Sequence, residues 1–254
     1  MEGEPGFPFL FSFSFVSSAY LRDLCGNAFG FKGFMEEVLA KWRILLDKID
    51  AWFARSMELY PESIACRSGC SACCRSTFDI TLLDAYYLKL GFDQLPEATR
   101  ERVLAKCRER LDLMRETWPE FDHPYLLNYR DEEEWDALMP DEDETPCVLL
   151  GEDGRCLVYH YRPMTCRLHG IPLIDTGGEV MHDEWCTMNF TDADPLQIDG
   201  LKAPFDAMLR EEVALFREFT AALLGKRMNE LDTFIPTALL IDFENCDTFK
   251  DWIK

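Results

Sequence analysis

Two long stretches of the chain place apolar residues at three- or four-residue intervals, the spacing of a helix with one buried face. The first begins at Met35 and ends before Pro61, and the second begins after Pro204 and ends near Gly225. Proline cannot continue a helix and glycine commonly follows the last turn, so both ends agree with the apolar pattern. We predict a long amphipathic helix in each stretch.

Two further helices are predicted between these stretches. Thr81 and Asp84 have the spacing of an N-cap and its acidic partner, and Gly91 is placed to stop the short helix that follows. The next helix starts at Pro96 and carries Cys107 on its apolar stripe. We therefore interpret Cys107 as a core thiol rather than a metal ligand.

The pattern changes to short apolar runs in the second half of the chain. The segment CVLL-GEDG-RCLVY, in which Asp153-Gly154 suits a tight turn, predicts one β-hairpin, and PLID-TGG-EVMH predicts another. With the helices, these segments predict a mainly helical α+β fold. Long helices are expected to pack around a small cysteine-rich β-hairpin metal-binding region.

Residues 1–34 differ from the rest, because phenylalanines alternate through a Pro/Ser-rich stretch with no basic residue before Arg22. A secretory signal places positive charge before its apolar run, so we interpret this segment as a disordered extension or an artefact of start-codon choice. Residues 35–254 are expected to form a single cysteine-cluster metal-binding domain, with its motifs at 60–190. The acidic run at 131–144 is interpreted as a solvated face or loop.

The balance of charge restricts the possible partners. With 26 basic and 47 acidic residues, the formal charge of −21 repels nucleic acid and anionic membrane surfaces. No apolar run approaches the roughly 20 residues that a membrane-spanning helix needs. We expect a soluble protein that binds neither nucleic acid nor a membrane, and the sequence indicates no particular protein partner.

The eleven cysteines add candidate chemistry to this picture. A chain of this length folds without disulfides, the number is odd, and neighbours such as Cys73-Cys74 can pair only through a strained ring. Free thiolates in this number favour the reducing cytoplasm and a metal centre.

Four of the cysteines fall in the segment CRSGCSACC, where Gly69 and two serines allow the loop to fold back around a soft metal. Four more are dispersed along the predicted hairpin region. Cys25, Cys107 and Cys246 are set aside. The eight candidate metal ligands are Cys66, Cys70, Cys73, Cys74, Cys147, Cys156, Cys166 and Cys186.

Arginines lie near both sets of cysteines, although acids predominate in the chain. Guanidinium groups lower the pKa of neighbouring thiols and offset the negative charge of a thiolate-rich centre. The alternative is that each arginine pairs with one of the abundant acids. We predict that Arg67, Arg75 and Arg162 bind or orient an anionic cofactor or substrate at the centre.

The motifs CRSGCSACC and GRCLVYHYRPMTCR, with a later WC, resemble the CxxCxxCC or YkgJ-like family of zinc- or iron-chelating domain proteins. The resemblance covers roughly residues 60–190 and implies that the eight cysteines hold zinc or iron, a [4Fe–4S] cluster included. The first spacing, CxxxC, is one residue longer than in the family's name, which leaves the partition of the ligands open. A flagellin lysine methylase carries a similar cluster reported as iron–sulfur.

Other interpretations of the same residues are weaker. The spacing CxxxCxxC also resembles that of radical S-adenosylmethionine enzymes, but their motif follows a strand and has an aromatic residue where this chain has Ala72. His169 and His182 lie close in sequence to cysteines. Because eight thiols suffice for a metal site, we interpret both as ordinary hydrogen-bonded histidines.

Two functional classes remain open. In the first, zinc held by four thiolates is structural and ties the hairpins together. In the second, an iron–sulfur or iron centre serves a redox or protein-modifying enzyme, such as a lysine methylase-like enzyme. Eight thiols allow two four-thiolate zinc sites, or one four-cysteine cluster with four cysteines spare.

Overall fold

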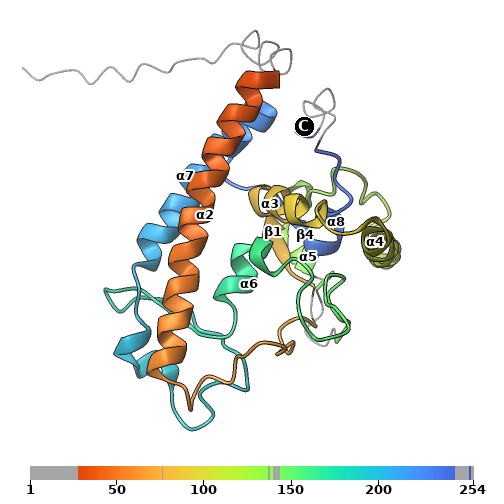
Figure 1. Ribbon diagram of the computed structural model, residues 1–254. Coiled ribbons are helices and arrows are strands. Elements are labelled where there is room, and N and C mark those ends of the chain that lie inside the picture. Colours follow the sequence, from red (N-terminus) through yellow and green to blue (C-terminus); the bar gives the residue numbers. More distant parts are fainter. Residues whose placement is uncertain (1–27, 76, 137, 140–143, 244–251, 253–254) are drawn as a thin grey trace, which may run out of the picture.

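The computed structural model describes residues 28–75, 77–136, 138–139, 144–243 and 252. Two long helices lie side by side along one side of the molecule and run in opposite directions (Figure 1). These helices are α2, Ala28–Leu59, and α7, Phe205–Leu224.

The α2–α7 helix pair is held by apolar burial. Trp42 and Leu45 of α2 are fully buried, as is Phe219 of α7. Burying a large apolar side chain contributes about 1.5–3 kcal/mol to folding. At the end of α2, the Trp52 indole N–H donates to the carbonyl of Leu201 at 2.7 Å, which fixes α2 against the chain entering α7.

The rest of the described structure contains shorter helices and two separate pairs of short strands. Strands β1 and β4 pair antiparallel, with Ile80 opposite Thr233. Strands β2 and β3 form a separate antiparallel pair. The elements are β1 Asp79–Thr81, α3 Leu82–Phe92, α4 Glu97–Thr117, α5 Glu132–Asp136, α6 Met164–Leu168, β2 Leu173–Ile174, β3 Val180–His182, β4 Asp232–Phe234 and α8 Ile235–Ala238.

Most of the predicted helix boundaries are confirmed. The Thr81 hydroxyl accepts from the Asp84 backbone N–H at 3.1 Å at the start of α3, and α4 follows Pro96. Gly225 ends α7 with φ of 70°, a left-handed conformation that suits glycine. Helix α2 begins at Ala28, upstream of the expected start.

The role predicted for Gly91 is wrong. Gly91 lies inside α3, which ends at Phe92 and is capped by Asp93. A Cβ at Gly91 would clash with the ring of Tyr161, so the glycine allows this ring to pack against the helix backbone. Close packing, and not helix termination, explains this residue.

The predicted fold class is confirmed as mainly helical α+β, but the two hairpins differ in outcome. β2 and β3 form the second hairpin, which carries no cysteine in its strands. Around the predicted first hairpin the described backbone makes a turn with one antiparallel bridge, Leu150 to Cys156, rather than paired strands. Gly154 adopts φ of 75° in this turn.

The acidic run at 131–144 is only partly described, and it is anchored as well as solvated. Trp135 and Leu138 are buried in a small apolar cluster with Phe234. Residues 137 and 140–143 lie outside the described residues, as do residues 1–27 with Cys25, and Cys246.

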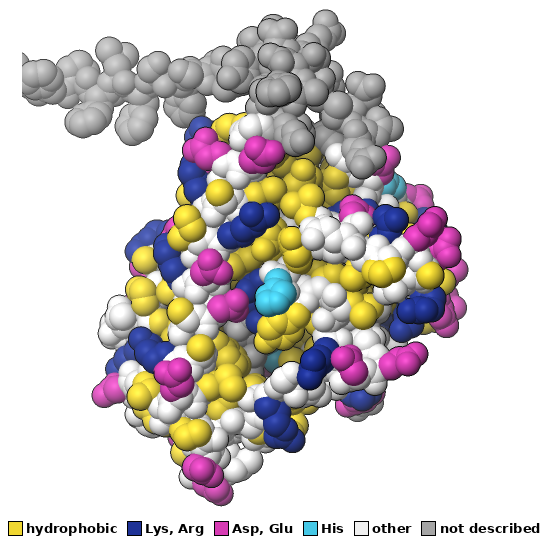
Figure 2. Space-filling view, in the orientation of Figure 1, with side chains coloured by type: hydrophobic (Ala, Val, Ile, Leu, Met, Phe, Trp, Pro, Cys, Tyr) yellow, Lys and Arg dark blue, Asp and Glu magenta, His cyan; other side chains and the backbone are white. Residues whose placement is uncertain are grey.

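The surface mixes apolar strips with charges of both signs. Figure 2 shows hydrophobic side chains running through the middle of one face, with acidic and basic side chains around them. None of the helices in the described ranges is both long and apolar enough to cross a lipid bilayer.

Candidate metal centre

The eight candidate cysteines lie on loops and on the short helix α6. Four of them, Cys66, Cys147, Cys156 and Cys166, pack against the apolar core to which α2 and α7 contribute. All eight are free thiols in partly exposed residues. We call residues 65–75, 145–157 and 183–189 the cysteine loops; they carry all of the eight except Cys166, which lies on α6. The first of these loops leaves the end of α2 (Figure 1).

Asn189 joins the first and last of the cysteine loops. Its side chain is buried; Nδ2 donates to the carbonyl of Gly170 at 2.6 Å and lies 3.5 Å from the sulfur of Cys66. Its Oδ1 accepts from the Ala65 N–H at 2.8 Å, and its backbone N–H donates to the carbonyl of Cys186. These bonds place Cys66 beside Cys186, although the two are far apart in sequence.

Backbone contacts also join the first loop to the middle one. The N–H of Cys147 donates to the carbonyl of Cys74 at 2.8 Å. A Cβ at Gly154 would stand 2.9 Å from the carbonyl oxygen of Gly69, so the tips of the two turns touch. Cys156 lies in the same turn as Cys147, because it forms the bridge with Leu150.

Helix α6 brings Cys166 to the same region. A buried carboxylate, Asp84, accepts from the N–H of Met164 at 2.9 Å and so fixes the start of α6. Its carboxylate also interacts with the indole N–H of Trp42, although Oδ1 and this N–H do not meet in ordinary hydrogen-bond geometry. Burial raises the pKa of Asp84, because the charged form has lost its hydration.

Most of these thiols hold their protons more tightly than a free cysteine does. A hydrogen bond between the adjacent thiols raises the pKa of Cys73 and lowers that of Cys74. Burial raises the pKa of Cys147 to about 11. Metal binding must therefore displace protons from the cysteines. Burial is also the main cause of the raised pKa values of Cys66, Cys156 and Cys166.

Arg162 is the predicted arginine whose charge acts on the cysteines. Its guanidinium lies 3.9 Å from the ring centre of Tyr159 and pairs with Asp50 at 3.4 Å. The positive charge opposes the rise in pKa of three thiols, Cys73, Cys156 and Cys166.

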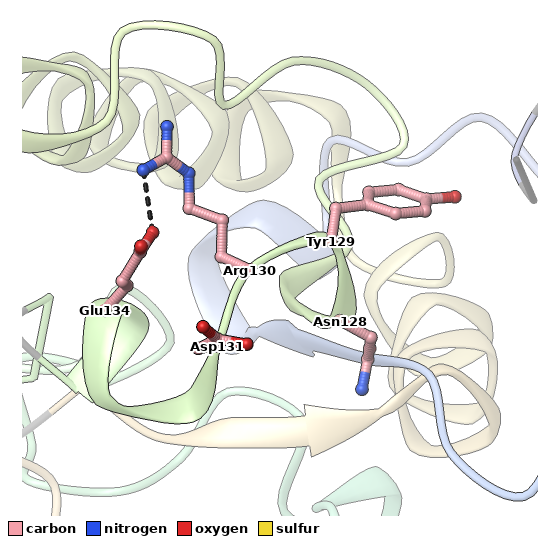
Figure 3. A pocket seen from close by; sticks show the side chains of 5 residues that line it. All are labelled: Asn128, Tyr129, Arg130, Asp131 and Glu134. Atoms are coloured by element: carbon pink, nitrogen blue, oxygen red, sulfur yellow. Dashed lines mark hydrogen bonds and ion pairs between the residues drawn. The ribbon is translucent and has the colours of Figure 1, made fainter.

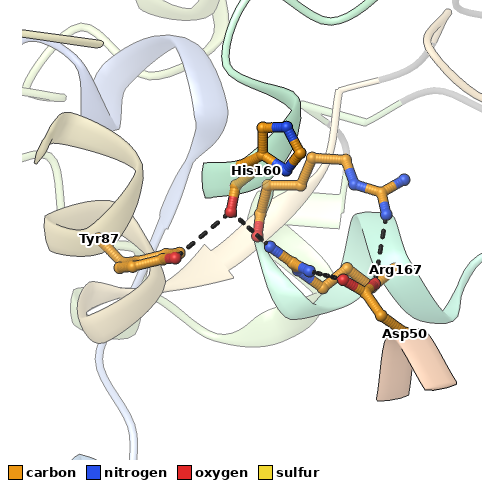
Figure 4. Close-up of polar contacts among 5 residues, drawn as sticks. Asp50, Tyr87, His160 and Arg167 are labelled. Carbon is orange, nitrogen blue, oxygen red and sulfur yellow. Dashed lines mark hydrogen bonds and ion pairs between the residues drawn. The ribbon is translucent and has the colours of Figure 1, made fainter. Parts of the chain in front are cut away.

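Arg167 plays a structural part in the same network. It is buried, forms an ion pair with Asp50, and donates to the carbonyl of His160 at 2.8 Å (Figure 4). Tyr87 donates to the same carbonyl. These bonds tie the segment before α6 to α2 and α3.

The other two predicted arginines lie in the first cysteine loop. Arg67 is exposed, and its guanidinium donates to the carbonyl of Ala65 at 3.2 Å. Arg75 is also exposed. Both therefore border the cysteines from the solvent side.

The thiols are gathered but do not form a closed shell. Among the residues that the structure describes, no group of three or more His, Cys, Asp or Glu side chains is arranged to hold a metal ion. The ring of His169 packs edge-on against Phe78, with 5.6 Å between ring centres, in line with an ordinary packed histidine. The donor chemistry fits a thiophilic metal, and the loops must draw closer to coordinate one.

A polar hollow on another part of the surface offers a different environment. It has a volume of about 470 Å³ and is bordered by charged and polar side chains, including an ion pair of Arg130 and Glu134 at 2.8 Å (Figure 3). No cysteine borders it. Its lining residues are Asn128, Tyr129, Arg130, Asp131 and Glu134.

Comparison with known proteins is consistent with this location. Residues 65–187, a little under half of the chain, match the CxxCxxCC family model, whose description is "Putative zinc- or iron-chelating domain". The matched segment contains all eight candidate cysteines. No curated protein and no solved structure matches the chain.

Proposed function

Residues 65–187 match the CxxCxxCC family model, and from this premise we propose that the protein binds iron or zinc through its eight clustered cysteines. The metal is either an iron–sulfur cluster or individual zinc or iron ions. The observation that carries the proposal is the meeting of thiols from four separate segments of the chain, joined by the Cys147–Cys74 backbone bond and by Asn189. Bound zinc would stabilise the loops, and an iron–sulfur cluster would add electron transfer.

The metal is tested by purifying the full chain under anaerobic conditions and measuring its absorption spectrum and metal content. A colourless protein that contains zinc alone would exclude the iron–sulfur form. A brown protein that bleaches in air would exclude a purely structural zinc site. A protein without any bound metal, which also takes up none when zinc or iron is supplied, would contradict the proposal.

The ligands are tested by replacing single cysteines. Cys73→Ser and Cys166→Ser are expected to lower the metal content sharply, because each removes a thiolate donor. Cys107→Ser is the control: this thiol is fully buried in the apolar core, and burial raises its pKa to about 12. Equal loss of metal from all three variants would show that the division of the cysteines is wrong.

A second candidate is a redox or protein-modifying enzyme, lysine methylase-like in kind, that acts at an iron–sulfur centre flanked by arginines. The charge of Arg162, which acts on three of the cysteines, favours it. Dithionite is then expected to reduce the centre reversibly. Arg162→Gln would lower the reduction potential, because the lost positive charge no longer stabilises the added electron.

Arg217→Gln is the control for this experiment, because Arg217 is an exposed arginine on α7, outside the cysteine loops. A centre that dithionite does not reduce, or a potential that is equally insensitive to both variants, would contradict the redox candidate.

A further inference from the structure

We propose that the eight cysteines form two separate four-thiolate metal centres whose ligands alternate along the chain. This division rests on the proposed function, in which the cysteines are metal ligands. It cuts through the segment CRSGCSACC, which supplies three ligands to one centre and a single ligand to the other. The first centre comprises Cys66, Cys70, Cys73 and Cys186, and the second comprises Cys74, Cys147, Cys156 and Cys166.

Contacts of the backbone support the second centre. Cys147 donates to the carbonyl of Cys74, and Leu150, which is bridged to Cys156, donates to the carbonyl of Cys147 at 2.9 Å. Repulsion between like charges weakens with distance, so it is a second indication of proximity beside these backbone contacts. Such repulsion links every pair within the second set of four cysteines.

The first centre is supported by the contacts around Gly170 and Asn189. A Cβ at Gly170 would lie 3.7 Å from the sulfur of Cys66 and 3.9 Å from the Cβ of Cys186, so both cysteines border this glycine. Asn189 donates toward the Cys66 sulfur from the same place. Besides burial, the negative charges of Cys186, Cys70 and Cys73 act on the Cys66 thiol and raise its pKa, as expected of neighbouring thiols.

The local backbone explains how Cys70 returns toward Cys66. The N–H of Cys70 donates to the carbonyl of Arg67 at 2.9 Å, which closes a tight turn, and Gly69 adopts φ of 86° within it. A left-handed residue at this point reverses the chain. Cys66 therefore directly precedes the turn that ends at Cys70.

Cys73 and Cys74 mark the junction of the two centres. A second turn closes here, because the N–H of Cys74 donates to the carbonyl of Ser71 at 3.0 Å. Cys73 lies close enough to Cys66 of the first centre for their charges to interact, and Cys74 is related in the same way to Cys147 of the second centre. Cys73 also repels Cys147, so the two centres are neighbours. Four thiolates complete the shell of a zinc ion or a [4Fe–4S] cluster, and this division leaves none of the eight spare.

Cobalt(II) is a suitable probe, because thiolate coordination gives it strong absorption bands that report the number of sulfur ligands. The reduced, metal-free full chain is expected to bind two equivalents of cobalt(II), each with a four-thiolate spectrum. Cys73→Ser and Cys74→Ser, although adjacent, should each lose one four-thiolate centre and retain the other.

Two double variants distinguish two separate centres from a single shared centre. Cys74→Ser with Cys147→Ser removes two ligands of one centre, so one four-thiolate equivalent should survive. Cys73→Ser with Cys74→Ser removes one ligand from each centre, so no four-thiolate spectrum should survive. Equal spectra from the two double variants, or the loss of both equivalents from a single variant, would overturn the division. Ala72→Ser controls for a polar substitution in the same loop.

A second measurement uses only the wild-type chain and so does not depend on the folding of variants. Zinc is added at one equivalent, and unprotected cysteines are alkylated and identified by mass spectrometry. The four cysteines of one proposed centre should be protected from alkylation together. Joint protection of cysteines from both centres, while other members of each centre are alkylated, would overturn the division. If the chain takes up neither cobalt, zinc nor iron, the proposed function itself fails; if it holds a single centre, only the division fails.

Discussion

The α2–α7 helix pair and the cysteine loops are stabilised in different ways. In the helix pair, large side chains such as Trp42 and Phe219 are fully buried, so apolar burial is the main stabilising contribution. In the cysteine loops, partly exposed thiols are positioned by a few backbone hydrogen bonds and by Asn189. The helices therefore form a scaffold that needs no ligand, whereas the loops would be closed by the metal that we propose they bind.

The largest expected effect comes from opening a cavity in the scaffold. Phe219→Ala should lower the free energy of unfolding by about 3–5 kcal/mol, because a fully buried ring is removed. Urea denaturation of the metal-free protein measures it. Val213→Ala is the matched control on the same helix, where a residue that is 37% exposed should change stability by about 0.5 kcal/mol or less.

The folded molecules of Phe219→Ala should bind the same number of cobalt ions per chain as the wild type. If Phe219→Ala removed metal binding without lowering stability, the helix pair would not be stabilised independently of the metal-binding loops.

A smaller effect, on metal affinity, is expected when Asn189, which positions the cysteine loops, is replaced. Asn189→Asp keeps the acceptor for Ala65 but loses the N–H donor to Gly170 and Cys66, and it adds a negative charge beside the thiolates. Since groups that orient metal ligands affect affinity about 10–100-fold, cobalt affinity should fall by about that factor. A competition titration with a chelator measures the change.

Asn229→Asp makes the same chemical change on an exposed residue outside the cysteine loops, whose side-chain oxygen accepts from Arg217. Its cobalt affinity should match that of the wild type. An equal loss in both variants would indicate a general effect of charge, and no positioning by Asn189.

The smallest expected effect, counted per pH unit and per group, is a pH dependence that arises outside the cysteine loops. Burial raises the pKa of Asp232 on β4 to about 7, and burial with the charge of Asp232 raises the pKa of Glu212 on α7 to about 7. The folded protein therefore keeps protons that the unfolded chain releases above about pH 4. The free energy of unfolding should fall as pH rises toward 7, by at most about 1.4 kcal/mol per pH unit for each group.

Asp232→Asn should flatten this slope in the metal-free protein, as measured by urea denaturation between pH 4.5 and 7.5. Asp199→Asn is the control, because Asp199 is exposed and its pKa is lowered by Lys202. A slope that persists unchanged in Asp232→Asn would show that other groups cause it.

Features that depend on residues close together in the sequence could be predicted from it. Apolar periodicity predicted the long helices, and the side chain of Thr81 caps α3 as its spacing with Asp84 indicated. The β1–β4 ladder was not predicted, because each strand has only three residues and its partner lies at the other end of the domain. Asn189 was also missed, since a single asparagine after a cysteine carries no distinctive signal.

The sequence by itself determined which residues can bind a soft metal and which helices can bury an apolar face, because residue chemistry and short-range periodicity are local properties. Tertiary structure decided how these parts meet. It placed Gly91 against Tyr161, and it set Cys66 beside Cys186 and Cys74 beside Cys147. The physical reason is that long-range packing and backbone hydrogen bonds, and not spacing along the chain, bring distant thiols together.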